Sequence, residues 1–88
     1  MSYEIWKFQL PVKDEFILEI PQVEQMLSVQ VQGSNICLWA IVSTLLDAEK
    51  YKFYCVGTGL EFDAIGKSYI GTVQYNGFVW HYFYEKIA

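Results

Sequence analysis

Residues 75–86 read Tyr75-Asn76-Gly77-Phe78-Val79-Trp80-His81-Tyr82-Phe83-Tyr84-Glu85-Lys86, an Asn-Gly pair followed by a strongly aromatic run. Asn-Gly is the strongest short-range hairpin signal, because a two-residue type I′ turn needs φ > 0 at both central residues. Side chains alternate between the two faces of a strand. One face would hold Phe78, Trp80, Tyr82 and Tyr84, and the other Val79, His81 and Phe83. We therefore predict a C-terminal hairpin with one face in the core and a second face that needs a cover.

The composition favours a small domain with surplus apolar surface. The chain has 88 residues, of which 53% are hydrophobic and 18% aromatic, and its mean hydropathy is +0.18. A domain of this size buries only about 60% of the surface of its unfolded chain, so the interior is small. We expect one domain, residues 1–88. Its extra rings either form a homo-oligomer contact or a binding face, or they fill a compact β core.

The charge of the chain argues against direct binding of nucleic acid. The formal net charge is −4, and all six basic residues are lysines. Arginine is the side chain that reads phosphates and guanine edges with two parallel hydrogen bonds, and it is absent. We expect no nucleic-acid partner.

The cysteines and the N-terminal residues lead us to expect a cytoplasmic protein. Cys37 and Cys55 each fall in a strand-like run, and no apolar signal segment follows Met1. We expect two reduced, buried thiols, although a disulfide is conceivable if their strands pair. No apolar run approaches the ~20 residues that cross a bilayer, so we expect no membrane span.

Alternating apolar residues predict further strands along the chain. These strands cover residues 4–10, 16–20, 27–31, 36–42, 51–55 and 69–75, before the last strand at 78–85. The first two flank a polar turn, which predicts a hairpin. Residues 36–42 are apolar on both faces, as is the last strand, and this pattern is typical of the centre of a sheet. Seven short strands predict an all-β meander that closes as a small antiparallel barrel or sandwich of six to seven strands.

Two connections depart from the strand pattern. One short helical turn is an alternative for residues 43–49, because Val42, Leu45 and Leu46 are spaced as on one helix face. Residues 57–68 form the longest irregular stretch and contain three glycines. Long loops in compact domains are often functional.

Three motifs contain residue types that can carry chemistry. Gly57-Thr58-Gly59 is similar to a phosphate cradle but lacks the Lys-Ser/Thr of a P-loop, so its glycines either let the chain leave a strand or expose N–H groups to a ligand. His81 is the sole histidine and is either a hydrogen-bonded surface or interface imidazole or a general acid or base. Glu61 and Asp63 are either solvated or a carboxylate pair. We assign no catalytic residue, metal ligand or cofactor.

The remaining candidates are rings and a cation. Trp39, Trp80 and Tyr82 either stack on a planar ligand or pack in the core. Lys67, with Lys50 and Lys52, would have to neutralise an anionic ligand. The candidate ligand- or partner-binding residues are Trp39, Gly57, Thr58, Gly59, Lys67, Trp80, His81 and Tyr82.

Several short motifs carry a family resemblance. They include Trp6-Lys7, Leu38-Trp39-Ala40, Gly57-Thr58-Gly59, Ile70-Gly71-Thr72 and Trp80-His81. In this order they resemble those of a family of short uncharacterised proteins encoded by bacteriophages, prophages and some bacteria. The chain differs after Gly59, where Leu60-Glu61 stands in place of a His-Pro-like pair. The resemblance implies a phage context, and hence the host cytoplasm, but no mechanism.

Two hypotheses follow. The first is a non-enzymatic, phage-derived binding module that acts in counter-defence and sequesters a small host ligand, such as a nucleotide-type signal, at homo-oligomer interfaces. The second is a protein–protein inhibitor or a virion or host accessory protein that docks on a host protein through an aromatic β face.

Overall fold

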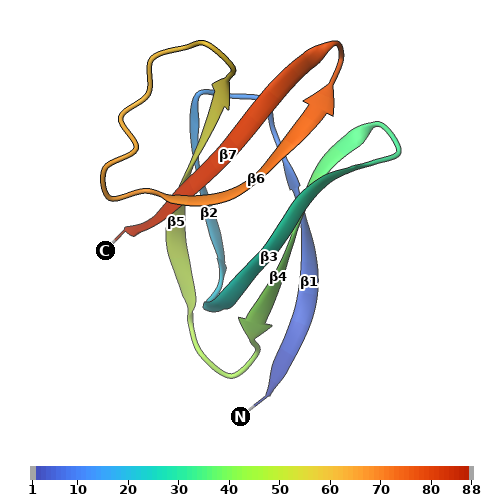
Figure 1. The fold of residues 1–88 in the computed structure, drawn as a ribbon. Coiled ribbons are helices and arrows are strands. Elements are labelled where there is room, and N and C mark those ends of the chain that lie inside the picture. The colour runs from blue at the N-terminus through green and yellow to red at the C-terminus, as the bar shows by residue number, and fades with distance from the viewer. Residues whose placement is uncertain (1, 88) are drawn as a thin grey trace.

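The computed structural model describes residues 2–87, which form seven β-strands and no helix. Figure 1 shows their arrangement. The strands are β1 (Tyr3–Leu10), β2 (Glu15–Pro21), β3 (Val23–Gln32), β4 (Asn35–Ser43), β5 (Ala48–Gly57), β6 (Ser68–Tyr75) and β7 (Phe78–Ile87). All paired strands are antiparallel. The predicted all-β class and the number of strands are confirmed.

The strands form two sheets that face each other. Sheet A has three strands in the order β1-β4-β3, and sheet B has four in the order β2-β5-β7-β6. Within residues 2–87 no ladder joins the sheets, so the architecture is that of a sandwich and not of a closed barrel. β4 and β7 are both interior strands, as their two-sided apolar patterns predict.

The two sheets come closest along β3 and β6, which lie side by side (Figure 1). A Cβ added at Gly71 would lie 3.3 Å from the backbone N of Val29, so glycine permits this approach. Both strands carry register shifts, in β3 between Val23 and Gln25 and between Met26 and Ser28, and in β6 between Tyr69 and Gly71. Such bulges bend an edge strand and increase its twist, which brings these edges together without pairing them.

The core lies between the inner faces of the sheets. β4 contributes Ile36, Leu38, Ala40 and Val42, each no more than 2% exposed. The facing side of sheet B contributes mainly larger side chains, namely Tyr51, Phe53, Cys55, Val73 and Tyr82. An aliphatic layer therefore packs against a largely aromatic one.

The predicted C-terminal hairpin is present. Asn76 has φ 52° and Gly77 has φ 81°, as a type I′ turn requires. The turn joins β6 to β7, which pair from Tyr75↔Phe78 inward.

The predicted hairpin of the first two strands is wrong, and so is the meander. β1 pairs with β4, and β2 pairs with β5, so the first two strands lie in different sheets. Residues 11–14 cross between the layers, where Pro11 O accepts a hydrogen bond from the Tyr82 hydroxyl and Asp14 O accepts one from Cys55 N. β1 and β2 each have one apolar face that must be buried. That face is buried equally well whether the two strands pair in one sheet or face each other from opposite sheets.

The helical turn considered at 43–49 is also wrong. Ser43 is the last residue of β4, and its N–H donates to Gln22 O at 2.8 Å. Thr44 N donates to Ser2 O at 3.2 Å, and β5 begins at Ala48. The intervening residues are needed to cross from one sheet to the other, which leaves too few for a helical turn with its own hydrogen bonds.

Two further expectations concern the thiols and the membrane. Cys37 and Cys55 are buried, and neither forms a disulfide. Among residues 2–87, no helix is long and apolar enough to cross a bilayer.

Candidate functional site

A groove of about 420 Å³ opens at one end of sheet B, where β5 ends and β7 begins. Its lining consists of Gly57, Thr58, Leu60, Gly77, Phe78, Val79 and Trp80. A Cβ at Gly57 would lie 3.4 Å from both Leu60 Cδ1 and Trp80 Cζ3, so the bare glycine lets these side chains pack closely against the backbone. No charged side chain lines the groove, and Thr58 supplies the sole side-chain hydroxyl there.

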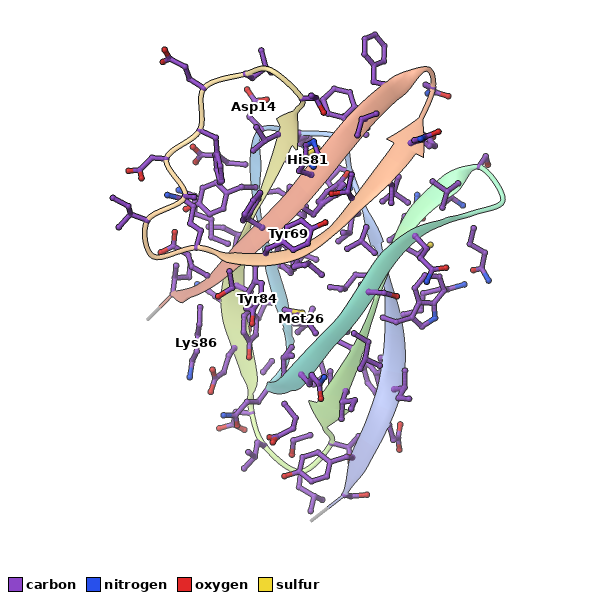
Figure 2. All side chains as sticks on the ribbon, viewed as in Figure 1. Asp14, Met26, Tyr69, His81, Tyr84 and Lys86 are labelled. Carbon is purple, nitrogen blue, oxygen red and sulfur yellow. The ribbon has the colours of Figure 1, made fainter. Side chains whose placement is uncertain are left out.

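The Thr58 hydroxyl belongs to a chain of hydrogen bonds on the outer face of sheet B. Thr58 Oγ1 lies 2.7 Å from His81 Nε2, and Thr72 Oγ1 lies 2.8 Å from His81 Nδ1. The Tyr69 hydroxyl extends the chain to Thr72 Oγ1 at 2.6 Å. Tyr69 and His81 project from the neighbouring strands β6 and β7 (Figure 2). Because a neutral imidazole donates from one nitrogen and accepts at the other, His81 links the orientations of the two threonine hydroxyls.

The segment around the groove is held by backbone hydrogen bonds. Thr58 N donates to Val79 O at 3.3 Å, which continues the pairing of β5 with β7. Leu60 N donates to Gly57 O at 3.2 Å across a turn in which Gly59 has φ +91°. Gly59 is therefore required by the turn and does not line the groove.

The loop that follows the groove covers part of the outer face of β7. Phe62 packs on Phe83 with ring centroids 4.7 Å apart and on Tyr54 at 6.0 Å. Lys67 Nζ lies 4.9 Å from the centre of the Tyr54 ring and donates to Asp63 O at 2.7 Å. Lys67 thus holds the loop on the sheet, at a distance from the groove lining.

The two carboxylates of the loop have different surroundings. Asp63 Oδ1 accepts the N–H of Ile65 at 3.0 Å. Glu61 lines a separate pocket of about 260 Å³ beside Asp14 and Glu15. Across residues 2–87, no three His, Cys, Asp or Glu side chains gather in a way that could hold a metal ion.

The eight candidate residues divide into four groups. Gly57, Thr58 and Trp80 line the groove, and His81 supports Thr58 from the outer face. Gly59 and Lys67 shape the adjoining loop. Tyr82 is a fully buried core residue whose hydroxyl donates to Pro11 O at 3.0 Å, and burial raises the pKa of this phenol. Trp39 lies on the outer face of the other sheet, so the structure does not bring it to the groove.

Sequence reasoning missed four lining residues, namely Leu60, Gly77, Phe78 and Val79. The Asn-Gly turn marked the end of a hairpin, but its position beside Gly57 depends on the pairing of β5 with β7. That pairing joins segments with β6 between them in the sequence, and no local pattern reports it.

The fold and the groove define a small two-sheet antiparallel β-sandwich with an open apolar groove on sheet B. The chain belongs to the family described as Domain of unknown function (DUF7352), whose model matches residues 1–88. No curated protein and no solved structure matches the chain.

Proposed function

We propose that this protein is a non-enzymatic binding module that takes up a small, uncharged and largely planar ligand in the groove beside Trp80. The observation that carries the proposal is the lining, which combines apolar side chains with a single hydroxyl and no charge. Ligand sites are typically concave, mostly apolar and of about 300–1,000 Å³, with a few polar groups that orient the ligand. The groove meets each of these conditions.

The rings favour a flat ligand. The centroids of Phe78 and Trp80 lie 5.7 Å apart, with 41° between the ring planes. Phe78 is 63% exposed and Leu60 is 67% exposed, so both have apolar surface left to bury. A planar ligand could cover these side chains at a small cost in its own conformational entropy.

The hydroxyl of Thr58 supplies orientation. His81 holds it from one side, so the hydroxyl does not have to be ordered when a ligand arrives. Such preorganisation favours affinity because less rotational freedom is lost on binding.

The lysines favour an uncharged ligand over a phosphorylated one. Lys52 Nζ pairs with Glu15 Oε1 at 2.8 Å, and Lys67 lies over the rings of Tyr54 and Phe62. None of the lysines lines the groove. The phage-like motifs suggest sequestration of a nucleotide-type host signal in counter-defence, and this remains a prediction. Such a ligand would have to keep its charged phosphates outside the groove.

A fragment screen tests the proposal. Saturation-transfer NMR on the full chain, with neutral heteroaromatic fragments and a phosphorylated counterpart of each, should favour the neutral members. Trp80→Leu and Thr58→Val should each weaken the hits at least tenfold. Trp39→Leu and Thr44→Val make the same changes away from the groove and should leave the hits unchanged. Hits that survive Trp80→Leu, or no hits at all, would refute the proposal.

The second candidate function is docking of a host or virion protein on the same aromatic end. It is favoured by the apolar side chains exposed at this end, Phe78 at 63% and Leu60 at 67%. A pull-down from host lysate that yields one stoichiometric protein, lost with Phe78→Asp but kept with Ile65→Asp, would support docking in place of ligand uptake.

A further inference from the structure

The outer face of sheet A has an unusual composition. The side chains of β4 that point away from the core alternate with the buried ones, and the register places neighbours from β1 and β3 beside them. The face forms three rows across the sheet, which are Ile5–Ile41–Gln25, Lys7–Trp39–Ser28 and Gln9–Cys37–Gln30, with Asn35–Gln32 at the end. We call this set the amide face.

The amide face carries almost no charge. The chain has ten Asp and Glu residues, yet none occupies these rows, and Lys7 is the sole charged member. The outer face of sheet B differs, because Lys52 and Glu85 face outward in one row of paired strands. Glu15 faces outward in the next row, and its carboxylate lies 2.8 Å from Lys52 Nζ. Exposed faces of small soluble proteins usually mix both signs of charge.

The polar groups of the amide face bind one another. Lys7 Nζ donates to Gln32 Oε1 at 2.7 Å, and Gln9 Nε2 donates to Asn35 Oδ1 at 3.1 Å. Gln30 Nε2 reaches Ser28 Oγ at 3.3 Å. These bonds hold the side chains in place around an apolar strip formed by Trp39, Ile41 and Ile5, of which Ile5 is 62% exposed.

An apolar centre with a ring, few charges and a polar rim is the composition of protein–protein contact surfaces. We propose that two copies of this chain associate through their amide faces. A second copy fits better than a charged partner, since the amide face offers no carboxylate and one lysine to pair with opposite charges. The amides are also both donors and acceptors, so the surface can complement itself about a two-fold axis.

The net charge of the chain supports the same choice. Each copy carries −4, so two copies that meet through acidic surface repel each other. The paired rows of the amide face contain no carboxylate, and the exposed Glu24, in the β3 bulge beside Gln25, borders them. Added salt should therefore strengthen the dimer or leave it unchanged, because it screens the overall repulsion and breaks no intermolecular ion pair.

The small size of the face favours a weak association. β4 has nine residues, and three strands at a spacing of about 4.8 Å and a rise of about 3.4 Å per residue give a footprint of roughly 400 Å² per copy. The total of roughly 800 Å² is below the about 1,200 Å² of stable complexes. We expect a weak dimer with a dissociation constant in the micromolar range.

The dimer does not depend on the proposed ligand. The groove is built by β5, β7 and their adjoining turns in sheet B, so it stays open when the amide faces meet. Loss of ligand binding with an intact dimer would refute the groove alone, and a monomer that binds fragments would refute the dimer alone.

Sedimentation equilibrium from about 1 to about 300 µM tests the proposal across the expected range. Ile5→Glu should weaken association at least tenfold. Ile17→Glu is the matched control, because Ile17 is 54% exposed, points outward from edge strand β2 of sheet B and gives the same change in charge. Ile17→Glu should leave the dissociation constant within about twofold of the unmodified chain, a shift of roughly 0.4 kcal/mol.

A second pair of variants ensures that the test does not rest on the substitution of Ile5 alone. Gln30→Glu places a carboxylate in the amide face, and Gln74→Glu makes the same change on the outer face of sheet B. The first should weaken association and the second should not, with circular dichroism confirming that each variant is folded. A monomer at all concentrations, or equal weakening within either pair, would overturn the proposal.

Discussion

β4 and β7 have similar sequences in one respect and very different surroundings. Both strands are apolar on both sides, and both lie inside their sheets. The second side of β4 is bordered mainly by uncharged residues of β1 and β3, with Lys7 as the one charged neighbour in these rows. The second side of β7 is instead covered partly by the chain itself, because Phe62 from the loop at residues 58–67 packs on Phe83. A two-sided apolar pattern thus predicts an interior strand but not what covers it.

The inner sides of the two strands differ as well. β4 presents small and aliphatic side chains to the core, including Leu38 and Ala40, both 0% exposed. β7 presents Tyr82, a large ring with a hydroxyl that must find an acceptor, and it finds Pro11 O. Sheet A therefore contributes volume to the core, and sheet B contributes both volume and polar groups that need partners.

The largest expected loss of stability distinguishes the inner side of β4 from its outer side. Leu38→Ala should lower the free energy of unfolding by about 3 kcal/mol, because it removes a fully buried side chain and leaves a cavity. Ile41→Ala, on the outer side of the same strand, should cost less than about 1.5 kcal/mol in the monomer. Urea unfolding at low protein concentration measures both. Equal losses would mean that the outer side of β4 is also buried in the folded chain.

The next largest loss of stability tests whether the loop at residues 58–67 covers the outer face of β7. Phe62→Ala should destabilise the protein by about 1–2 kcal/mol, since a half-buried ring loses its contacts with Phe83 and Tyr54. Limited proteolysis should then cut within residues 58–67, and binding of an apolar dye should increase.

Phe78→Ala is the matched control for the loop. Phe78 is 63% exposed and packs on Trp80 at the groove, so its loss should change the free energy of unfolding by less than about 0.5 kcal/mol. If Phe62→Ala were as mild, the loop would not stabilise the outer face of β7, and that face would resemble the uncovered outer side of β4.

These differences show which parts of the structure local sequence can predict. The turn at Asn76-Gly77 was predictable because it depends on the backbone preferences of two adjacent residues. The interior positions of β4 and β7 were predictable because a run that is apolar on both sides is typical of a strand at the centre of a sheet.

The pairing of strands was not predictable in the same way. β1 and β2 each have one apolar side, and this pattern is satisfied whether the strands pair with each other or face each other across the core. The choice depends on β4 and β5, which lie far along the chain. The same limit applies to the candidate site, because Trp80 and Tyr82 share one face of β7 but differ in position relative to the covering sheet. Tyr82 is fully buried in the core, and Trp80 borders the groove.

A smaller effect at neutral pH than those of Leu38→Ala and Phe62→Ala tests the polar inner side of β7. Tyr82→Phe should lower the free energy of unfolding by about 1 kcal/mol, because the carbonyl of Pro11 loses its donor inside the protein. The variant should also differ from the unmodified chain at high pH. Burial raises the pKa of Tyr82 in the folded state, whereas an unfolded tyrosine ionises near pH 10. The stability that depends on this neutral phenol is therefore complete below about pH 10 and is lost as the pH rises further, by up to about 1.4 kcal/mol per pH unit.

Urea unfolding between about pH 7 and about pH 11 separates this contribution from that of Cys55, whose thiol also has a pKa raised by burial. The loss of stability tied to the thiol begins at lower pH and should persist in Tyr82→Phe, while Cys55→Ala should remove it. Above about pH 10 the stability of Tyr82→Phe should fall less steeply than that of the unmodified chain. Parallel curves would mean that the Tyr82 phenol ionises as easily in the folded protein as in the unfolded chain. In that case the inner side of β7 would be accessible to water, unlike the aliphatic side of β4 that it faces.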